Sequence, residues 1–500
     1  MDKGTADRPL TAREQPPTTG AHPFSAPREW LLTASMLALA SLPLLVLVAL
    51  PALLVMTDSA ATAAPFAVLT TLAVLGAIAA RRRLPGRAVR PHDEPELAAL
   101  VQDVAERLGF RAPLLVRIVP DVQASLSRAR VSGVRAYVLV LGLPVLRTLS
   151  ADQLAALVAH ELTHARHVGH RRTAWLLMAR HVLGTELKPR FRPLAPVATP
   201  LLRASQPRAW RTETDSDADA ARLLGTATTT AALERSILLG ALYESYGLRW
   251  WDALARHDGG TFPQDFYEAL DSALHDPHVI RTMARAAADH DALDPYATAD
   301  HPPLVHRLAA LPDAEAVTAY GDEPLPLHTG PALEQWCVAQ LADEQAGPRR
   351  RRRDRQPAPR PIRLLALPPE ELRRLVDHEG PSPLRAATRQ DSPAQALTSA
   401  LDAVADGSWP RLARRIEPGI SRAPASVRPA YSRTVLAGAM TLALAAVLRD
   451  AGWTYPSRWR TGVLTSPDGM VVDVNELLTV AVETGDTAPV RALLATEVAA

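Results

Sequence analysis

Two uncharged, strongly apolar segments lie near the start of the chain, Leu31 to Met56 and Ala60 to Ala80. Each is long enough to cross the hydrocarbon core of a bilayer as a helix. A signal peptide is shorter and closer to the terminus, and a buried soluble hairpin rarely contains uninterrupted apolar stretches of this length. The pattern therefore predicts two transmembrane helices within residues 28–83. The Pro- and Thr-rich residues 1–27 before them are expected to be disordered.

Positive charge flanks both apolar segments on their outer sides. Arg28 precedes the first segment, a group of arginines from Arg81 to Arg90 follows the second, and the short connection contains only Asp58. Positively charged flanks stay in the cytoplasm. We therefore expect a multi-pass protein of the cell membrane, in contact with the lipid bilayer, whose main domain faces the cytoplasm.

After residue 90 the hydrophobic pattern alternates between the periods of helices and strands. It predicts an amphipathic helix, two strands of a small sheet and three further helices. These elements cover residues 94–110, Leu114 to Val119, Ala136 to Leu141, 151–168, 208–224 and 229–253. The fold class is therefore mainly α with a small β-sheet, α+β, and the domain is expected to cover residues 91–345.

An Arg- and Pro-rich stretch at residues 346–361 has the composition of a solvated linker. Residues 362–500 after it are expected to form a separate α+β region. Two short apolar runs around the turn Ser466-Pro-Asp-Gly469 predict a β-hairpin there. The apolar stretch from Val435 to Val447 is too short to predict a membrane span. No catalytic pattern occurs in this region, and we expect it to bind a partner or substrate.

Composition narrows the class of protein. The chain has 500 residues and a net charge of +2, so bulk charge predicts no attraction to nucleic acid. Lys3 and Lys188 are the only lysines, an arginine bias typical of a GC-rich bacterial genome. Cys337 is the sole cysteine, which excludes an internal disulfide and is consistent with a reducing compartment.

The stretch from His160 to His164 reads His-Glu-Leu-Thr-His, an HExxH motif inside the predicted helix 151–168. Histidines four positions apart on a helix differ by about 40° of rotation, so both imidazoles face the same side. They can bind one zinc ion, and Glu161 can accept a proton from a zinc-activated water. Ser150 and Gln153 have the pattern of a capping box at the start of the helix. A catalytic zinc still needs a third protein ligand.

His170 is one candidate for the third ligand. Its distance from His164 matches the outline of an HExxHxxGxxH motif, but His167 occupies the position of the glycine that would turn the chain back. If the helix simply continues, His170 points about 240° away from His164. Histidines and arginines here are better interpreted as the polar end of a helix, where cations complement the dipole.

Glu213 is the other candidate for the third ligand. It shares one face of the predicted helix 208–224 with Asp217. One carboxylate can complete a His2Glu zinc site, and the second can accept the outward N–H of a ligand histidine. The alternative is that Thr212 caps a helix whose first turn is acidic only to complement the helix dipole. Gly225 is expected to end this helix.

Three segments together resemble the HtpX-type and CAAX-prenyl-endopeptidase-type membrane zinc metalloproteases. They are the HExxH segment after a strand-like stretch, Glu213 to Asp217, which is similar to the family's ExxAD motif, and His301 to Arg307, which is similar to its HPPxxxR motif. Their order and separations also fit, over about residues 30–311. The resemblance implies a gluzincin-like zinc protease domain with one zinc ion per chain. By this resemblance, the zinc ligands would be His160, His164 and Glu213. Glu161 would be the general base, and Asp217 would be the carboxylate that supports a ligand histidine.

The chain departs from this family at three places. Gln123-Ala124-Ser125 stands where the family has an Asn-Ala-Phe-like segment on an edge strand that helps to hold the substrate backbone. Ser216 stands where the family usually has alanine before the supporting aspartate. HtpX-type members carry further membrane spans after the active helix, but charged residues interrupt 173–205, and we predict no span there.

His301 has two interpretations. We expect it near the active-site cleft, where its ring helps to stabilise the developing oxyanion. The alternative is that Pro302 and Pro303 only rigidify a turn before a helix, with Arg307 in a structural ion pair.

The sequence therefore predicts a membrane-anchored zinc endopeptidase that hydrolyses peptide bonds with a zinc-activated water and a glutamate base. By resemblance, its substrates are peptides or membrane proteins, and its role is in membrane-protein quality control. Prenylated substrates are less expected in a bacterial chain with so few predicted spans. The alternative is a non-catalytic membrane scaffold with a structural zinc and a partner-binding C-terminal region. The sequence predicts no oligomeric state.

Overall fold

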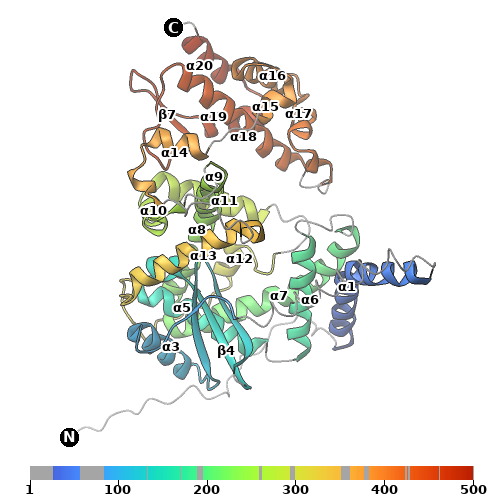
Figure 1. Ribbon diagram of the computed structural model, residues 1–500, viewed down its shortest axis with the longest axis vertical. Helices are drawn as coiled ribbons and strands as arrows, with labels where there is room; N and C mark the ends of the chain where they lie inside the picture. The colour runs from blue at the N-terminus through green and yellow to red at the C-terminus, as the bar shows by residue number, and fades with distance from the viewer. Residues whose placement is uncertain are drawn as a thin grey trace. The chain divides into compact units, whose positions relative to one another are not determined.

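The computed structural model describes residues 26–56, 84–131, 133–168, 171–187, 195–257, 262–292, 299–350, 361–376, 382–422, 425, 428–460 and 462–498. Within these residues the chain is mainly helical and has small sheets, which confirms the expected fold class (Figure 1). Contacts between residues divide the chain into two compact units. The first unit comprises residues 1–239 and 296–337, and the second comprises 240–295 and 338–500.

This division differs from the expected boundaries, because residues 240–295 group with the C-terminal region. The reason is an aromatic core within the second unit. The ring of Trp250 contacts the rings of Tyr246, Phe266 and Trp459, at centroid separations of 5.9, 6.3 and 5.3 Å. The expected linker, residues 346–361, lies mostly outside the described residues.

A four-stranded sheet lies in the first unit, with strand order β1-β2-β4-β3. β2 and β4 are parallel, whereas β3 and β4 are antiparallel, so β3 is an edge strand. Both predicted strands are confirmed, and β4 is longer than expected. The strand bounds are β1 Arg87–Ala88, β2 Leu114–Val119, β3 Ala124–Val131 and β4 Val134–Gly142.

The helices of the first unit that bear on the site lie beside this sheet and extend away from it. Figure 1 shows α3 and α5 beside the sheet, and α7 running from there toward α6 and α1, Ala26–Met56. The predicted amphipathic helix is confirmed as α3, which buries one apolar face. The bounds are α3 Pro95–Arg107, α4 Leu143–Thr148, α5 Ala151–His167, α6 Arg171–Leu187, α7 Ala195–Leu224 and α12 Leu304–Ala309.

The helix α5 begins and ends as its sequence predicts. The Ser150 hydroxyl accepts a hydrogen bond from the Gln153 backbone N–H at 3.2 Å, and the Gln153 side chain accepts one from the Ser150 N–H at 3.2 Å. This capping box satisfies two backbone donors that a helix start otherwise leaves unpaired. The last turn contains Arg166 and His167, as a polar helix end requires.

The helix α7 begins well before the expected residue 208. It contains Pro200 and Pro207, which lack the backbone N–H that helix interiors use. Burial of Ala198, Leu202 and Ala209 on this early half favours the helix over local propensity. Thr212 therefore lies inside the helix and is not its N-cap, so the capping alternative for Glu213 is wrong. The expected stop is confirmed, because α7 ends at Leu224 and Gly225 has φ +87°.

The first predicted membrane segment is helical, within α1, Ala26–Met56. At about 1.5 Å per residue, a helix of 31 residues is about 46 Å long. Leu32 and Met36 of its first half are buried in one cluster with apolar residues of α6 and α7. The second predicted segment, Ala60 to Ala80, lies outside the described residues. Both membrane spans stay predictions.

Among the described residues, one helix is long and apolar enough to cross a membrane, α18, Arg428–Asp450. It contains the Val435 to Val447 stretch, for which the sequence predicts no span, and 44% of its most apolar window is buried within the protein. Leu436, Met440 and Leu444 belong to the core of the second unit. This burial is typical of a core helix.

The second unit packs helices around an apolar core and has two-stranded sheets within its described residues. The predicted hairpin is confirmed: β7 and β8 pair antiparallel around a turn in which Gly469 has φ +87°. The predicted helix 229–253 is found as α8, Thr226–Leu242, a π-helical turn, Tyr243–Gly247, and α9, Leu248–His257. Most of α8 belongs to the first unit, and α13, Gly330–Arg350, begins there. The other bounds are β5 Phe262–Pro263, α10 Phe266–Ala273, α11 Pro277–Ala292, β6 Pro361–Ile362, α14 Pro369–Val376, α15 Pro383–Thr388, α16 Pro393–Ala405, α17 Trp409–Ile416, β7 Val463–Thr465, β8 Val471–Asp473, α19 Val474–Thr484 and α20 Ala488–Val498.

Candidate metal centre

The helices α5 and α7 pack closely along each other, and their contact surfaces explain why. Small side chains are buried on both helices, among them Ala155 and Ala159 on α5 and Ala220 on α7. Small residues let two helix backbones approach. The Thr163 hydroxyl of α5 lies 3.4 Å from the Ser216 carbonyl oxygen of α7. This approach brings a carboxylate of α7 within reach of imidazoles on α5.

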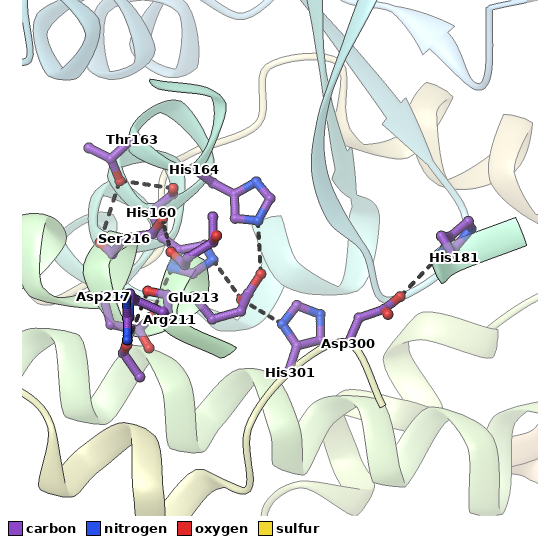
Figure 2. A network of polar contacts seen from close by, with 12 residues as sticks. His160, Thr163, His164, His181, Arg211, Glu213, Ser216, Asp217, Asp300 and His301 are labelled. Atoms are coloured by element: carbon purple, nitrogen blue, oxygen red, sulfur yellow. Dashed lines mark hydrogen bonds and ion pairs between the residues drawn. The ribbon is translucent and has the colours of Figure 1, made fainter. Parts of the chain in front are cut away.

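Both histidines of the HExxH motif point at the carboxylate of Glu213 (Figure 2). His160 Nε2 lies 3.5 Å from Glu213 Oε2, and His164 Nε2 lies 2.9 Å from Glu213 Oε1. The two rings are 6.1 Å apart between centroids with planes 30° apart, so they face the same side as predicted. His160 and Glu213 are buried, whereas the His164 side chain is 29% exposed. The site therefore has one buried side and one open to solvent.

A second carboxylate lies behind His160. Asp217 Oδ1 is 2.8 Å from His160 Nδ1, a distance that makes an ion pair, although the ring N–H is not aligned with an acceptor. Arg307 of α12 donates two hydrogen bonds to the same carboxylate, from Nε to Oδ2 at 2.8 Å and from NH2 to Oδ1 at 2.7 Å. This bidentate pair is buried and fixes the orientation of Asp217.

His301 contacts the same oxygen of the Glu213 carboxylate as His160 does. Its Nδ1 lies 2.6 Å from Glu213 Oε2, while 63% of the side chain is exposed. The residue is thus beside the other predicted site residues, with Nδ1 engaged by Glu213, and its expected role at the oxyanion stays a prediction. The expected ion pair of Arg307 is also present, with Asp217 as its partner.

Glu161 lies on α5 between the two histidines in sequence and is partly buried. Burial raises the pKa of its carboxyl, and the positive charges of His160 and His164 oppose that shift. A raised pKa makes a glutamate a stronger proton acceptor than an exposed one.

The remaining charges of the centre hold one another in their ionised forms. Burial lowers the pKa of His160, but the carboxylates of Asp217 and Glu213 outweigh it and raise this pKa to about 10. Burial raises the pKa of Glu213, but the charge of His301 and the contacts with both motif histidines bring it well below its ordinary value. The pKa of Asp217 is lowered in the same way, against burial, by Arg307 and His160. These side chains therefore form a network of ion pairs.

The donor set fits a zinc ion in type and spacing. Ligands at about 2.0–2.1 Å from a tetrahedral zinc lie roughly 3.4 Å apart. The 3.5 Å contact of His160 with Glu213 matches that separation, and the 2.9 Å contact of His164 would have to widen slightly. Within the described residues no group of three or more His, Cys, Asp or Glu side chains already surrounds a common point as a formed metal site would.

The structure brings together every residue that the sequence predicted for the site. They are His160, Glu161, His164, Glu213, Asp217 and His301. Their roles stay predictions. The competing ligand, His170, lies outside the described residues. Ala124 and Ser125 lie on the edge strand β3, where the resemblance would place a substrate-binding segment, and Gln123 directly precedes it.

Sequence reasoning missed two polar residues near the centre, Arg180 of α6 and Asp300. Arg180 donates from Nε to Asp300 Oδ1 at 3.0 Å, and Asp300 directly precedes His301. The only signal was a charged residue inside an otherwise apolar helix face, which was interpreted as evidence against a membrane span. Comparison with known proteins found no matching family model, no matching curated protein and no matching solved structure.

Proposed function

We propose that this protein is a membrane-anchored zinc endopeptidase of the gluzincin type, in line with its resemblance to the HtpX-type and CAAX-prenyl-endopeptidase-type enzymes. One observation carries the proposal: the imidazoles of His160 and His164 converge on the carboxylate of Glu213 (Figure 2), and Glu161 is close enough to interact electrostatically with all three. Two histidines and one glutamate form the ligand set of thermolysin-like catalytic zinc sites, which leave a fourth position for water or substrate.

In this proposal His160, His164 and Glu213 hold the zinc ion. Asp217 and Arg307 keep the ligand His160 oriented. The Asp217 carboxylate pairs with Nδ1 of His160, the ring nitrogen that does not face Glu213. Arg307 holds the Asp217 carboxylate in place through two hydrogen bonds. Such partners of a ligand histidine set its tautomer and raise its basicity. A role in packing alone would not require four neighbouring buried residues that carry charge, His160, Glu213, Asp217 and Arg307, which we call the charged row.

The proposed mechanism assigns the proton transfers to Glu161. When bound, zinc would acidify water and polarise the scissile carbonyl. Glu161 accepts the water proton and then delivers it to the leaving amine. Its partly buried carboxyl, with a raised pKa, suits both steps. His301 keeps Glu213 in place through Nδ1, and its exposed ring is available to the substrate side of the centre.

The proposed substrates are extended segments of membrane proteins or unfolded chains. The edge strand β3 leaves one row of backbone groups free of strand partners in the described sheet, and an extended peptide can add to such an edge. The predicted spans would keep the centre next to the bilayer, so substrates emerging from it would meet the edge strand. This part of the proposal follows the resemblance.

The test compares wild type with Glu161→Gln for bound zinc and for casein cleavage. Both proteins should bind one zinc ion, and the variant should cleave about 10²- to 10⁴-fold more slowly, because only the proton acceptor is lost. Glu106→Gln, which changes an exposed carboxylate on α3, is the matched control and should leave both readouts unchanged. Equal, zinc-dependent cleavage by wild type and Glu161→Gln would reject the assigned base.

A second candidate function is a non-catalytic scaffold with a structural zinc. The observation that favours it is the 2.6 Å contact of His301 with Glu213, because a fourth protein ligand beside the other three would close the site. In that case wild type would bind zinc and cleave nothing, and His301→Ala would lose zinc altogether. In the peptidase proposal, His301→Ala keeps zinc at saturating concentration and loses turnover.

A further inference from the structure

Arg180 is a buried cation on an otherwise apolar helix face. Its side chain is 1% exposed. It shares a face of α6 with Leu176 and Leu183, which lie one turn before and one turn after it and are buried against α1 and α7. A leucine would pack there without a desolvation penalty, whereas a buried guanidinium is stable only when it is fully paired. Packing alone therefore does not explain why an arginine occupies position 180.

The partners of Arg180 lie on two different segments. On α7, NH1 donates to the Leu202 carbonyl at 2.6 Å and to the Ser205 hydroxyl at 3.2 Å. On the segment that precedes His301, Nε donates to Asp300 Oδ1 at 3.0 Å and NH2 donates to the Ala299 carbonyl at 2.6 Å. The planar guanidinium fork thus joins the helix pair α6–α7 to the loop before His301.

This loop ends in the candidate centre. Asp300 is followed directly by His301, whose Nδ1 lies 2.6 Å from Glu213 Oε2 (Figure 2). Pro302 and Pro303 follow and restrict the backbone on the other side of His301. Arg180 on one side and the prolines on the other therefore hold His301 over the carboxylate.

We propose that Arg180 is a positioning residue for the zinc centre: it anchors the Ala299–Asp300 backbone so that His301 holds Glu213 in its ligand orientation. This inference rests on the proposed zinc site. It also implies that the centre is fastened to the helices that bury the first half of α1, because Ser205 contacts the Met36 sulfur at 4.0 Å. The packing of the predicted membrane helix would then bear on the orientation of a zinc ligand.

The test is a double-mutant cycle on zinc affinity, measured by competition with a chelator. His301→Ala should weaken zinc binding about tenfold, as loss of a ligand's supporting partner usually does. Arg180→Met should weaken it by a similar or smaller factor. The double variant should bind no more weakly than His301→Ala alone, because Arg180 acts through His301. Independent, multiplying effects, or an unchanged affinity in folded Arg180→Met, would overturn the proposal.

Further variants keep the proposal testable if Arg180→Met does not fold. Asp300→Asn changes a residue whose side chain is 39% exposed, so folding is expected to survive while the anchor weakens. Arg180→Lys keeps the charge without the fork and should give an intermediate zinc affinity. Arg222→Met, which removes an exposed arginine paired with Asp219 on α7, is the matched control and should match wild type. Wild-type affinity in Asp300→Asn would also contradict the proposal.

A measurement without metal separates this proposal from the proposed function. In the metal-free protein, backbone hydrogen exchange at residues 299–301 should be about tenfold faster in Arg180→Met or Asp300→Asn than in wild type. If wild type binds zinc but cleaves no peptide, the peptidase assignment fails and the zinc-affinity cycle still decides the role of Arg180. Unchanged exchange at 299–301 would show that Arg180 does not hold the loop.

Discussion

The two units bury different kinds of groups although both pack helices tightly. In the second unit the core formed by α15 to α19 is a continuous apolar cluster that includes Leu397, Leu444 and Leu478. In the first unit the contact between α5 and α7 contains His160, Glu213 and Asp217, and α12 adds Arg307. Charged groups in an interior are costly unless they are paired. Because the core of α15 to α19 packs without such groups, the buried charged residues between α5, α7 and α12 support the proposal that the first unit contains the functional site.

The largest effect should come from breaking the buried ion pair behind His160. Arg307→Met leaves the Asp217 carboxylate buried without its bidentate partner, and the free energy of unfolding should fall by about 3–5 kcal/mol. The double variant Asp217→Leu/Arg307→Met should recover most of that loss, since apolar groups of similar size often replace a buried pair at little cost. Urea denaturation measures both.

The same double variant separates stability from function. Its zinc affinity should be about 10- to 100-fold weaker than that of wild type, because His160 loses the partner that orients it. A double variant that regained stability and also kept wild-type zinc affinity would show that the charged row serves the fold alone.

A comparable disturbance of the second unit should leave the centre intact. Leu444→Ala removes a fully buried side chain from α18, and the free energy of unfolding should fall by about 2–5 kcal/mol. Bound zinc per chain and the rate of casein cleavage at low temperature should stay at their wild-type values. Loss of zinc from the folded variant would contradict the separation of the two units' roles.

The pH dependence of zinc binding tests the charge state of His160. Its pKa is raised to about 10 by Asp217 and Glu213 against the effect of burial, so the metal-free protein holds a proton that zinc must displace. Zinc affinity should therefore rise with pH between 7 and 9, by up to about tenfold per pH unit, which is about 1.4 kcal/mol. Competition with a chelator at several pH values measures this, and a pH-independent affinity would refute it.

The raised pKa of His160 also determines how the stability of the protein without zinc changes with pH. The protonated His160 stabilises the fold fully below its ordinary pKa of 6.5, and this contribution is lost as the pH rises toward about 10. Saturation with zinc should remove this dependence, because the metal takes the place of the proton.

The smallest predicted effect concerns the N-terminal cap of α5. Ser150→Ala removes the hydroxyl that accepts the Gln153 N–H, and the free energy of unfolding should fall by about 1 kcal/mol. The proposed ligands His160 and His164 lie more than two turns away on α5, and Glu213 lies on α7, so zinc affinity should not change. Thermal unfolding of wild type and variant provides the measurement. A stability equal to wild type would show that the cap contributes nothing in the folded protein.

The parts of the site whose residues lie on a single helix could be predicted from the sequence. The capping box at Ser150, the HExxH spacing and the shared face of Glu213 and Asp217 depend only on helix geometry, and the structure has each of them. The β2 and β4 strands and the hairpin around Gly469 follow in the same way from short-range patterns.

Features that depend on tertiary packing were not predictable. The early start of α7 overrides Pro200 and Pro207, because the gain from buried contacts is not visible in local propensity. The edge strand β3 has a polar, arginine-containing sequence without clear alternation, since its sides are only partly covered. Arg180 gave no functional signal, because its partners at Ala299 and Asp300 lie far along the chain.

The central claim is that Glu213, and not His170, completes a site with the two motif histidines. The most direct test is the zinc content of purified Glu213→Ala and His170→Ala beside wild type, with folding checked for each. We expect one zinc ion per chain in wild type and in His170→Ala, and little or none in Glu213→Ala. Zinc retained by Glu213→Ala and lost from His170→Ala would contradict it.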